Sequence, residues 1–185
     1  MTLASYLLAA IATLPVYRED VGADLVAQKN AQAEMIATAV AQTAERAKGW
    51  PGTERELAAL MLAVAWHETR LSLRIHDGRC RPLECDRGRA RGLWQLHVHR
   101  SLPRERWLGV AGLNLQSTQN AAHEAAIALI RSRRMCSVVT RGRDWVGATL
   151  SAYAGLGCGG RLPDLDARVR TYRRLAALKP KPSAA

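Results

Sequence analysis

The chain has 185 residues, 48% of them hydrophobic, which excludes a disordered tail and suits one domain with a real core. Its formal net charge of +11 attracts polyanions, and nucleic acid, anionic lipid and anionic cell-wall polymers all qualify. A basic surface that serves solubility alone is the other interpretation, and the charge does not choose among these.

The N-terminal residues 1–14 are largely apolar and predict a helix that ends before Pro15. The stretch is as long as the apolar part of a signal peptide, but no Lys or Arg precedes it and no clear small-residue cleavage site follows. We therefore expect an ordinary helix, and the export route of a wall-acting protein stays open. No run is long and apolar enough to span a bilayer, so stable membrane insertion is not expected.

Residues 22–48 have apolar side chains at helical spacing and predict a second helix, with Gly49 as its stop. Thr53 and Glu56 then form a capping box, which predicts a third helix from there to about Arg70. The apolar stripe of this third helix consists of Leu57, Leu60, Met61, Val64 and Ala65.

The second half of the chain begins with an irregular polar loop at 72–91 and a short apolar turn at 92–98. Ser117 is expected to cap a helix that runs to about Arg134, and Asp144 another that ends near Gly155. The last helix is expected to start at Pro163 and Asp164.

Few stretches alternate between polar and apolar residues, so strands should be minor and the fold class mainly α. We expect a single domain over residues 1–178, in which helices within residues 1–50 pack on the core. The Pro-rich remainder, 179–185, predicts a disordered tail.

The chain contains four cysteines, and the even number suits two disulfides. Cys80 with Cys85 and Cys136 with Cys158 is the pairing we expect, although four cysteines allow three pairings. A zinc site is an alternative, but the spacing lacks the close Cys-x-x-Cys pair of zinc ribbons. Reduced, buried thiols are a further alternative.

Glu68 lies near the end of the third predicted helix, on the same stripe as Met61 and Val64. Burial there would disfavour the charged carboxylate and raise its pKa. A carboxylic acid that stays protonated near neutral pH is what cleavage of a glycosidic bond requires. The alternative is that Glu68 turns outward at the helix end and pairs with Arg70 or Arg74.

The segments around Glu68 occur in a particular order: AVAWHETRLS (63–72), ARGLWQLHVHRS (90–101) and TLSAYAGLGCGG (149–160). This order resembles the soluble lytic transglycosylases and goose-type lysozymes of the lysozyme-like superfamily. In that group a helix-end Glu is followed by a Gly-Leu-Met-Gln-Ile type turn and an Ala-Tyr-Asn-Ala-Gly type helix end. The segment NAAHEAAIAL (120–129) also resembles the start of the family's central helix.

The resemblance implies a lysozyme-like domain with a small irregular or β-like region beside a sugar cleft, and Glu68 as the catalytic acid. It also implies substrate-binding residues, namely Gly92, Leu93, Trp94, Gln95 and Tyr153. Gln95 would offer its amide to a sugar, Gly92 would let the backbone approach the substrate, and Trp94 would either stack on a sugar or belong to the core. The sequence departs from the family at Thr69, where Ser is usual, at Trp94, where Met is usual, and in lacking the Asn after Tyr153.

A second carboxylate would separate two reactions. A lytic transglycosylase needs one acid/base residue, because a hydroxyl of the sugar itself attacks, whereas a hydrolase normally needs a second carboxylate. The candidates are Asp86 and Asp77, in a loop that also holds Glu84. Solvated ion pairs with the neighbouring arginines are the alternative role for these side chains.

His67, His97 and His99 raise the possibility of a metal site, but no third well-placed ligand supports it. We expect neither a metal nor a cofactor.

The prediction is an enzyme that cleaves the MurNAc–GlcNAc β-1,4 bond of peptidoglycan, as a lytic transglycosylase or a lysozyme. Its partner would be the glycan strand rather than nucleic acid, and we expect a monomer. It would act in the periplasm, outside the cell, or as a phage protein delivered to the wall. The alternatives are a lysozyme-like wall-binding or structural protein with reduced turnover, and a basic helical protein that binds nucleic acid.

Overall fold

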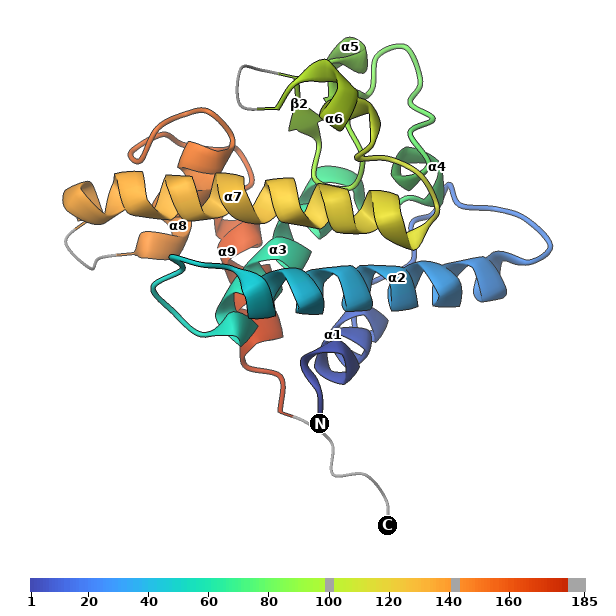
Figure 1. Cartoon of the computed structure of the whole chain (residues 1–185), viewed down its shortest axis with the longest axis horizontal. Coiled ribbons are helices and arrows are strands. Elements are labelled where there is room, and N and C mark those ends of the chain that lie inside the picture. The colour runs from blue at the N-terminus through green and yellow to red at the C-terminus, as the bar shows by residue number, and fades with distance from the viewer. Residues whose placement is uncertain (99–101, 141–143, 180–185) are drawn as a thin grey trace.

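The computed structural model describes residues 1–98, 102–140 and 144–179, and it is mainly helical, as the sequence predicts (Figure 1). The longer helices are α1 (Leu3–Ala12), α2 (Leu25–Arg46), α3 (Glu54–Thr69), α7 (Leu115–Thr140), α8 (Trp145–Tyr153) and α9 (Leu165–Ala176). The short helices are α4 (Leu73–His76), α5 (Cys85–Gly88) and α6 (Arg104–Leu108). The antiparallel strands β1 (Ala90–Arg91) and β2 (Leu96–His97) form a small sheet in which Ala90 faces His97 and Arg91 faces Leu96. The predicted tail lies outside the described residues, apart from Lys179.

The capping box predicted for α3 is confirmed. The Thr53 side chain accepts a hydrogen bond from the Glu56 backbone N–H at 3.2 Å, and the Glu56 carboxylate accepts one from the Thr53 N–H at 2.7 Å. These bonds satisfy donors that the first turn of a helix leaves without a partner, so the start of α3 is fixed locally.

Two other predicted caps are wrong. The helix expected from Ser117 begins at Leu115, because the Asn114 side chain accepts the hydrogen bond of the Ser117 N–H at 2.9 Å. Asn is as good an N-cap as Ser, and here it stands earlier in the chain. Asp144 precedes α8 as expected, but its side chain makes no capping bond and instead lies 3.8 Å from Arg173.

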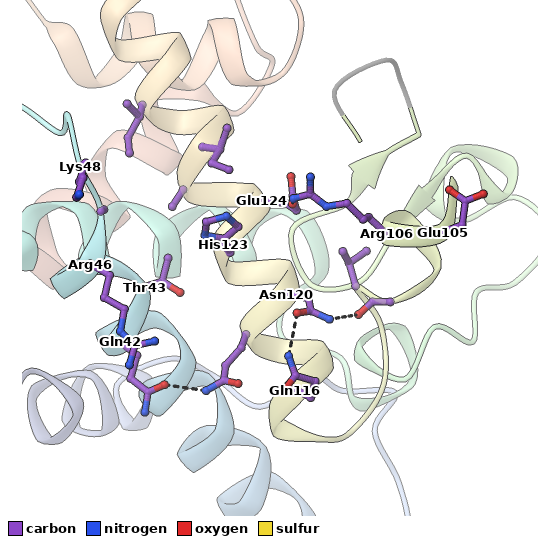
Figure 2. A pocket seen from close by; sticks show the side chains of 17 residues that line it. Gln42, Thr43, Arg46, Lys48, Glu105, Arg106, Gln116, Asn120, His123 and Glu124 are labelled. Carbon is purple, nitrogen blue, oxygen red and sulfur yellow. Dashed lines mark hydrogen bonds and ion pairs between the residues drawn. The ribbon is translucent and has the colours of Figure 1, made fainter. Parts of the chain in front are cut away.

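The helices α2 and α7 run side by side across the front of the molecule in Figure 1. Between the C-terminal half of α2, the helix α7 and the segment Glu105–Val110 lies a cavity of about 810 Å³, which we call the α2–α7 groove (Figure 2). Most of the residues that line it are polar, whereas the opposite side of each helix packs into the core.

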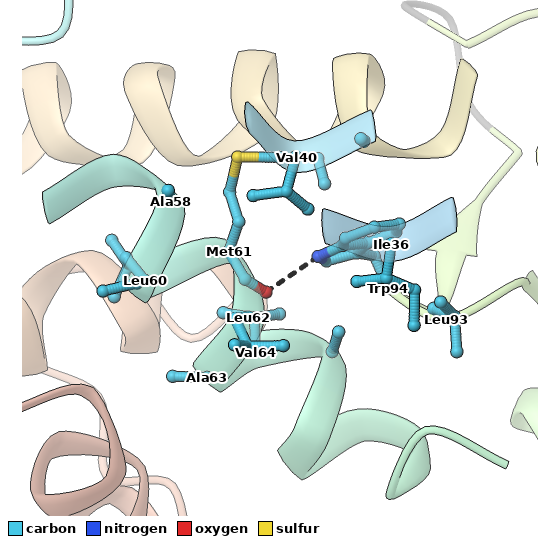
Figure 3. Packing of buried hydrophobic residues seen from close by; sticks show 14 of the residues in the cluster. Ile36, Val40, Ala58, Leu60, Met61, Leu62, Ala63, Val64, Leu93 and Trp94 are labelled. Carbon is cyan, nitrogen blue, oxygen red and sulfur yellow. Dashed lines mark hydrogen bonds between the residues drawn. The ribbon is translucent and has the colours of Figure 1, made fainter. Parts of the chain in front are cut away.

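The helix α3 is buried all the way round from Leu57 to Trp66, rather than along the single stripe that the sequence predicts. It contacts α1, α2, α7 and α9, so no face of it remains for solvent. Trp94, from the turn between the strands, completes the packing near Ile36 and Met61 (Figure 3). Its indole N–H donates to the Met61 carbonyl at 2.9 Å, which satisfies the one polar atom of this fully buried ring.

A buried polar network ties α2 to the beginning of α7. Lys29 pairs with the buried carboxylate of Asp20. The Gln32 amide lies 3.2 Å from His76 Nδ1, and His76 Nε2 lies 2.9 Å from the Thr118 hydroxyl. Burial lowers the pKa of His76 to about 4, so the ring is neutral near physiological pH.

Both predicted disulfides are present, Cys80–Cys85 and Cys136–Cys158. The first closes part of the loop before β1, and the second joins α7 to the loop that follows α8. They are compatible with an oxidising compartment. Among the helices that the structure describes, none is both long and apolar enough to cross a membrane.

Gly92, between the two strands, has a φ of +69°, and a Cβ atom added there would lie 2.3 Å from the Val110 carbonyl oxygen. The absence of a side chain therefore allows one backbone segment to approach another. The close neighbour of Gly92 is therefore Val110, and the approach of its backbone to a substrate stays a prediction.

Gly92→Ala should lower the free energy of unfolding by about 3 kcal/mol, since it combines an unfavourable φ with a clash against fixed backbone. Gly155→Ala is the matched control. Gly155 has a φ of +80° but nothing within 4 Å of an added Cβ, so only the conformational cost of about 1 kcal/mol should remain. Urea unfolding of both variants measures the difference, and equal losses would contradict the clash.

His76 should make the stability depend on pH between about 4 and 6.5. In that window the unfolded chain binds a proton at this ring and the folded chain does not, so the free energy of unfolding falls as the pH falls. The full loss should be about 3 kcal/mol from the shift in pKa. His76→Gln should flatten the dependence in urea unfolding at a series of pH values, whereas the exposed control His97→Gln should not. Parallel curves for His76→Gln and the unaltered chain would contradict the assignment.

Candidate functional site

Glu68 is the last residue but one of α3, at the point where the enclosure of that helix ends. Its side chain is 20% exposed to solvent, so it lies at the edge of the core. The carboxylate Oε1 accepts a hydrogen bond from Arg168 Nη1 of α9 at 2.5 Å. The expected partners Arg70 and Arg74 do not form this ion pair; Arg70 lies over the Trp66 ring, and Arg74 pairs with Glu84.

Arg168 continues the contact into a chain of polar groups along α9. Its Nε donates to Asp164 Oδ1 at 2.9 Å, and the other oxygen of Asp164 lies 3.3 Å from His67 Nδ1. His67 Nε2 is 2.9 Å from the Thr171 hydroxyl. The side chains that surround Glu68 are therefore held in place by one another.

The charged groups of this polar network shift one another's pKa values. Burial alone would lower the pKa of Arg168, but the carboxylates of Glu68 and Asp164 raise it above the usual value. Burial would likewise raise the pKa of Asp164, but its bonds with Arg168 and His67 lower it. Burial, with the charges of Arg168 and Arg70, lowers the pKa of His67. Arg168 thus stays a cation between two carboxylates.

Tyr153, from the last turn of α8, approaches the same place. Its hydroxyl donates to the Trp94 carbonyl at 2.8 Å. Burial, and then the negative charge of Glu68, raise the pKa of its phenol, so Tyr153 stays a neutral hydrogen-bond donor. Tyr153 thus lies near enough to Glu68 to feel its charge, and its role at the site stays a prediction.

Thr69 makes a third connection at the turn between the strands. Its buried hydroxyl lies 2.9 Å from the Ala65 carbonyl, one turn back in α3, and 3.3 Å from the Leu93 carbonyl. The end of α3 and the end of α8 are thus both bound to backbone carbonyls of the 92–96 turn.

The 92–96 turn exposes fewer side chains to a possible substrate than the resemblance implies. Leu93 and Trp94 are 1% and 0% exposed, so their side chains belong to the core and the prediction that they contact substrate is corrected. The signal was ambiguous, because an apolar side chain in a turn suits either role. Gln95 stays partly exposed, with its amide nitrogen 3.0 Å from the Gly92 carbonyl, and its contact with substrate stays a prediction.

The candidate second carboxylates lie apart from Glu68. Asp77 pairs with Arg79 at 2.9 Å, and Asp86 lies 3.8 Å from His97. Neither joins Glu68 through a hydrogen bond or an ion pair among the described residues. The carboxylate linked to Glu68 is Asp164, through the shared Arg168.

The histidines do not assemble into a metal site within the described ranges. His97 has Asp86 beside it, His67 contacts Asp164 and Thr171, and His99 lies outside the described residues. No group of three potential ligands occurs in the part of the chain that the structure describes.

Arg168 and Asp164 are the functional candidates that the sequence analysis missed. Arg168 is buried in α9 together with Val169, Tyr172 and Leu175. An arginine on a buried face of a helix is the same signal that drew attention to Glu68 in α3. The partnership spans 100 residues and could not be inferred from either helix by itself.

Comparisons with known protein families, with curated proteins and with solved structures find no match to this chain. The functional argument therefore depends on the geometry around Glu68 and on the sequence motifs.

Arg168→Gln should lower the free energy of unfolding by about 3 kcal/mol, because it leaves two partly buried carboxylates without their cation. Arg173→Gln is the matched control on the same helix. Its ion pair with Asp144 is at 3.8 Å, and both side chains are more than 60% exposed, so the loss should stay below about 1 kcal/mol. Thermal or urea unfolding measures both, and similar losses would show that the buried pair is not special.

Proposed function

We propose that this chain is a lysozyme-like peptidoglycan glycosidase that cleaves the MurNAc–GlcNAc β-1,4 bond, with Glu68 as the acid and then the base. The main support is the way three separated segments meet at the 92–96 turn. Thr69 and Tyr153 contact the carbonyls of Leu93 and Trp94, and Glu68 stands beside them.

The chemistry requires a proton on Glu68. Arg168 donates to Oε1 of this carboxylate, so the resting contact occupies an oxygen that has to face the sugar. In the proposed reaction the entering sugar displaces Arg168, Glu68 takes up a proton from water, and the carboxylic acid then protonates the leaving oxygen. Tyr153 donates its one hydroxyl hydrogen to the Trp94 carbonyl, so its oxygen could only accept a hydrogen bond from the protonated Glu68.

The proposal favours the lytic transglycosylase over the hydrolase. A transglycosylase uses the one carboxyl group as acid and then as base, while the sugar's own hydroxyl attacks and gives an anhydro product. Asp77 and Asp86 are engaged with Arg79 and His97, which speaks against a second carboxylate from that loop.

A second candidate function is wall binding without turnover, and the Glu68–Arg168 pair is the observation that favours it. A carboxylate that stays paired with a buried arginine contributes to stability but does not donate a proton. Nucleic-acid binding is less favoured, because several arginines already lie over aromatic rings of the chain itself: Arg55, Arg70, Arg91 and Arg133. The disulfides suit action in the periplasm or outside the cell.

Digestion of purified peptidoglycan, followed by mass spectrometry of the soluble fragments, tests the proposal. The unaltered chain should release fragments, and Glu68→Gln should reduce the rate by at least about 100-fold, since it removes the proton donor. Glu45→Gln, an exposed glutamate on α2, is the control and should leave the rate unchanged.

The ends of the fragments separate the two reactions. Anhydro ends would identify a lytic transglycosylase, and reducing ends a lysozyme. Equal release by Glu68→Gln would sink the assignment of the acid. Sedimentation with peptidoglycan but no release from the unaltered chain would favour the wall-binding function.

A further inference from the structure

The α2–α7 groove is separate from the contacts around Glu68. Its lining comes from residues 42–48 of α2 and the loop after it, residues 105–110, and residues 116–130 of α7, and neither Glu68 nor Arg168 is among them. A volume of about 810 Å³ is enough for a ligand of several residues.

Four carboxamide side chains line the groove, namely Gln42 from α2 and Gln116, Gln119 and Asn120 from α7; Figure 2 labels three of them, Gln42, Gln116 and Asn120. Gln119 donates to Gln42 at 2.7 Å, and Gln116 donates to Asn120 at 3.0 Å. The second hydrogen of each amide group, and further lone pairs, stay available after these bonds. Such side chains match a ligand that carries both donors and acceptors at short intervals, as a peptide backbone does.

Opposite charges stand at the two ends of the groove. Arg46 and Lys48 are exposed at one end, and Glu105 is exposed at the other, as Figure 2 shows. Arg106 and Glu124, between them, neutralise each other in an ion pair. A ligand with a carboxylate at one end and an ammonium group at the other would meet complementary charge at both.

The lining residues include no Phe, Tyr or Trp side chain, and His123 supplies one imidazole ring. A run of bases or the apolar face of a sugar usually binds against larger rings, so the groove suits a peptide backbone better than either. Its apolar part is aliphatic and includes Ala47, Val110 and Ala126, which suits ligand side chains as small as that of alanine.

We propose that the α2–α7 groove binds a short peptide, with its terminal carboxylate at Arg46 and Lys48, its backbone along the carboxamides, and a free ammonium group toward Glu105. The choice of peptide rests on the proposed function: the stem peptide of peptidoglycan has small side chains, a terminal carboxylate and, in many walls, a diamino acid. The groove would then hold the stem while Glu68 acts on the glycan.

The test is calorimetric titration of the full chain with a synthetic stem tetrapeptide that ends in D-Ala, combined with amide chemical shifts of the labelled protein. The free acid should bind and shift signals of α2 and α7. The same tetrapeptide with a C-terminal amide should bind at least about tenfold more weakly, since it lacks the charge for Arg46 and Lys48. Chitotetraose, a sugar without a peptide, should leave these signals unchanged.

The variant Arg46→Gln/Lys48→Gln should lose about tenfold or more in affinity for the free acid and none for the amide. Arg131→Gln/Arg174→Gln is the control, because it removes the same charge from exposed positions outside the groove. Circular dichroism checks that each variant is folded, and Gln119→Ala provides a second variant within the lining. Absence of binding, equal affinity for acid and amide, or shifts of the groove by chitotetraose would each overturn the proposal.

The outcome is distinguishable from a failure of the proposed function. Glycan strands stripped of their peptides provide the separate assay of Glu68. Cleavage of these strands without peptide binding would reject the groove alone, whereas peptide binding without cleavage would reject the glycosidase alone.

Discussion

The burial of α3 on every side is the constraint on which the rest of the structure depends. Apolar side chains around the whole circumference of a helix have to be enclosed, and α1, α2, α7 and α9 together do this. Trp94 closes the remaining side and places its indole N–H on a carbonyl of the same helix. The enclosure stops at the last turn of α3, so Glu68 emerges where the neighbours change from apolar side chains to polar ones. The position of the candidate site is therefore set by the place where the apolar core around α3 ends.

The sequence predicted those features whose causes lie within a few residues of one another. The capping box of Thr53 and Glu56 and the disulfide Cys80–Cys85 are of this kind, and both are confirmed. Other features depend on partners elsewhere in the chain. Gly92 lacks a side chain where Val110 is close, and Trp94 is buried because α2 and α3 cover it. For the helix expected from Ser117 the cause is local, because Asn114, three residues earlier, accepts the capping hydrogen bond.

The same limit applies to the candidate site. Glu68 could be selected from the pattern of one helix, and Tyr153 from the order of motifs. Arg168 could not be selected in this way, because its position beside Glu68 depends on how α9 crosses α3. That crossing changes the chemistry expected of Glu68. The guanidinium of Arg168, 2.5 Å from Oε1, occupies an oxygen of Glu68 that a substrate would have to reach. Whether a substrate separates the two charges is therefore what distinguishes an enzyme from a binding protein with the same fold.

The first and last helices are held together by a hydrogen bond from the Tyr6 hydroxyl to the Leu175 carbonyl at 2.6 Å, across 169 residues of sequence. Contacts of such long range form after local ones, because a large loop has to be closed first. During synthesis on the ribosome, α1 and α3 emerge long before α9 is made. Until then α3 lacks one of its covering helices and Glu68 lacks Arg168. The core of a newly made chain would therefore stay incomplete, and Glu68 would lack its partner, until α9 has emerged from the ribosome.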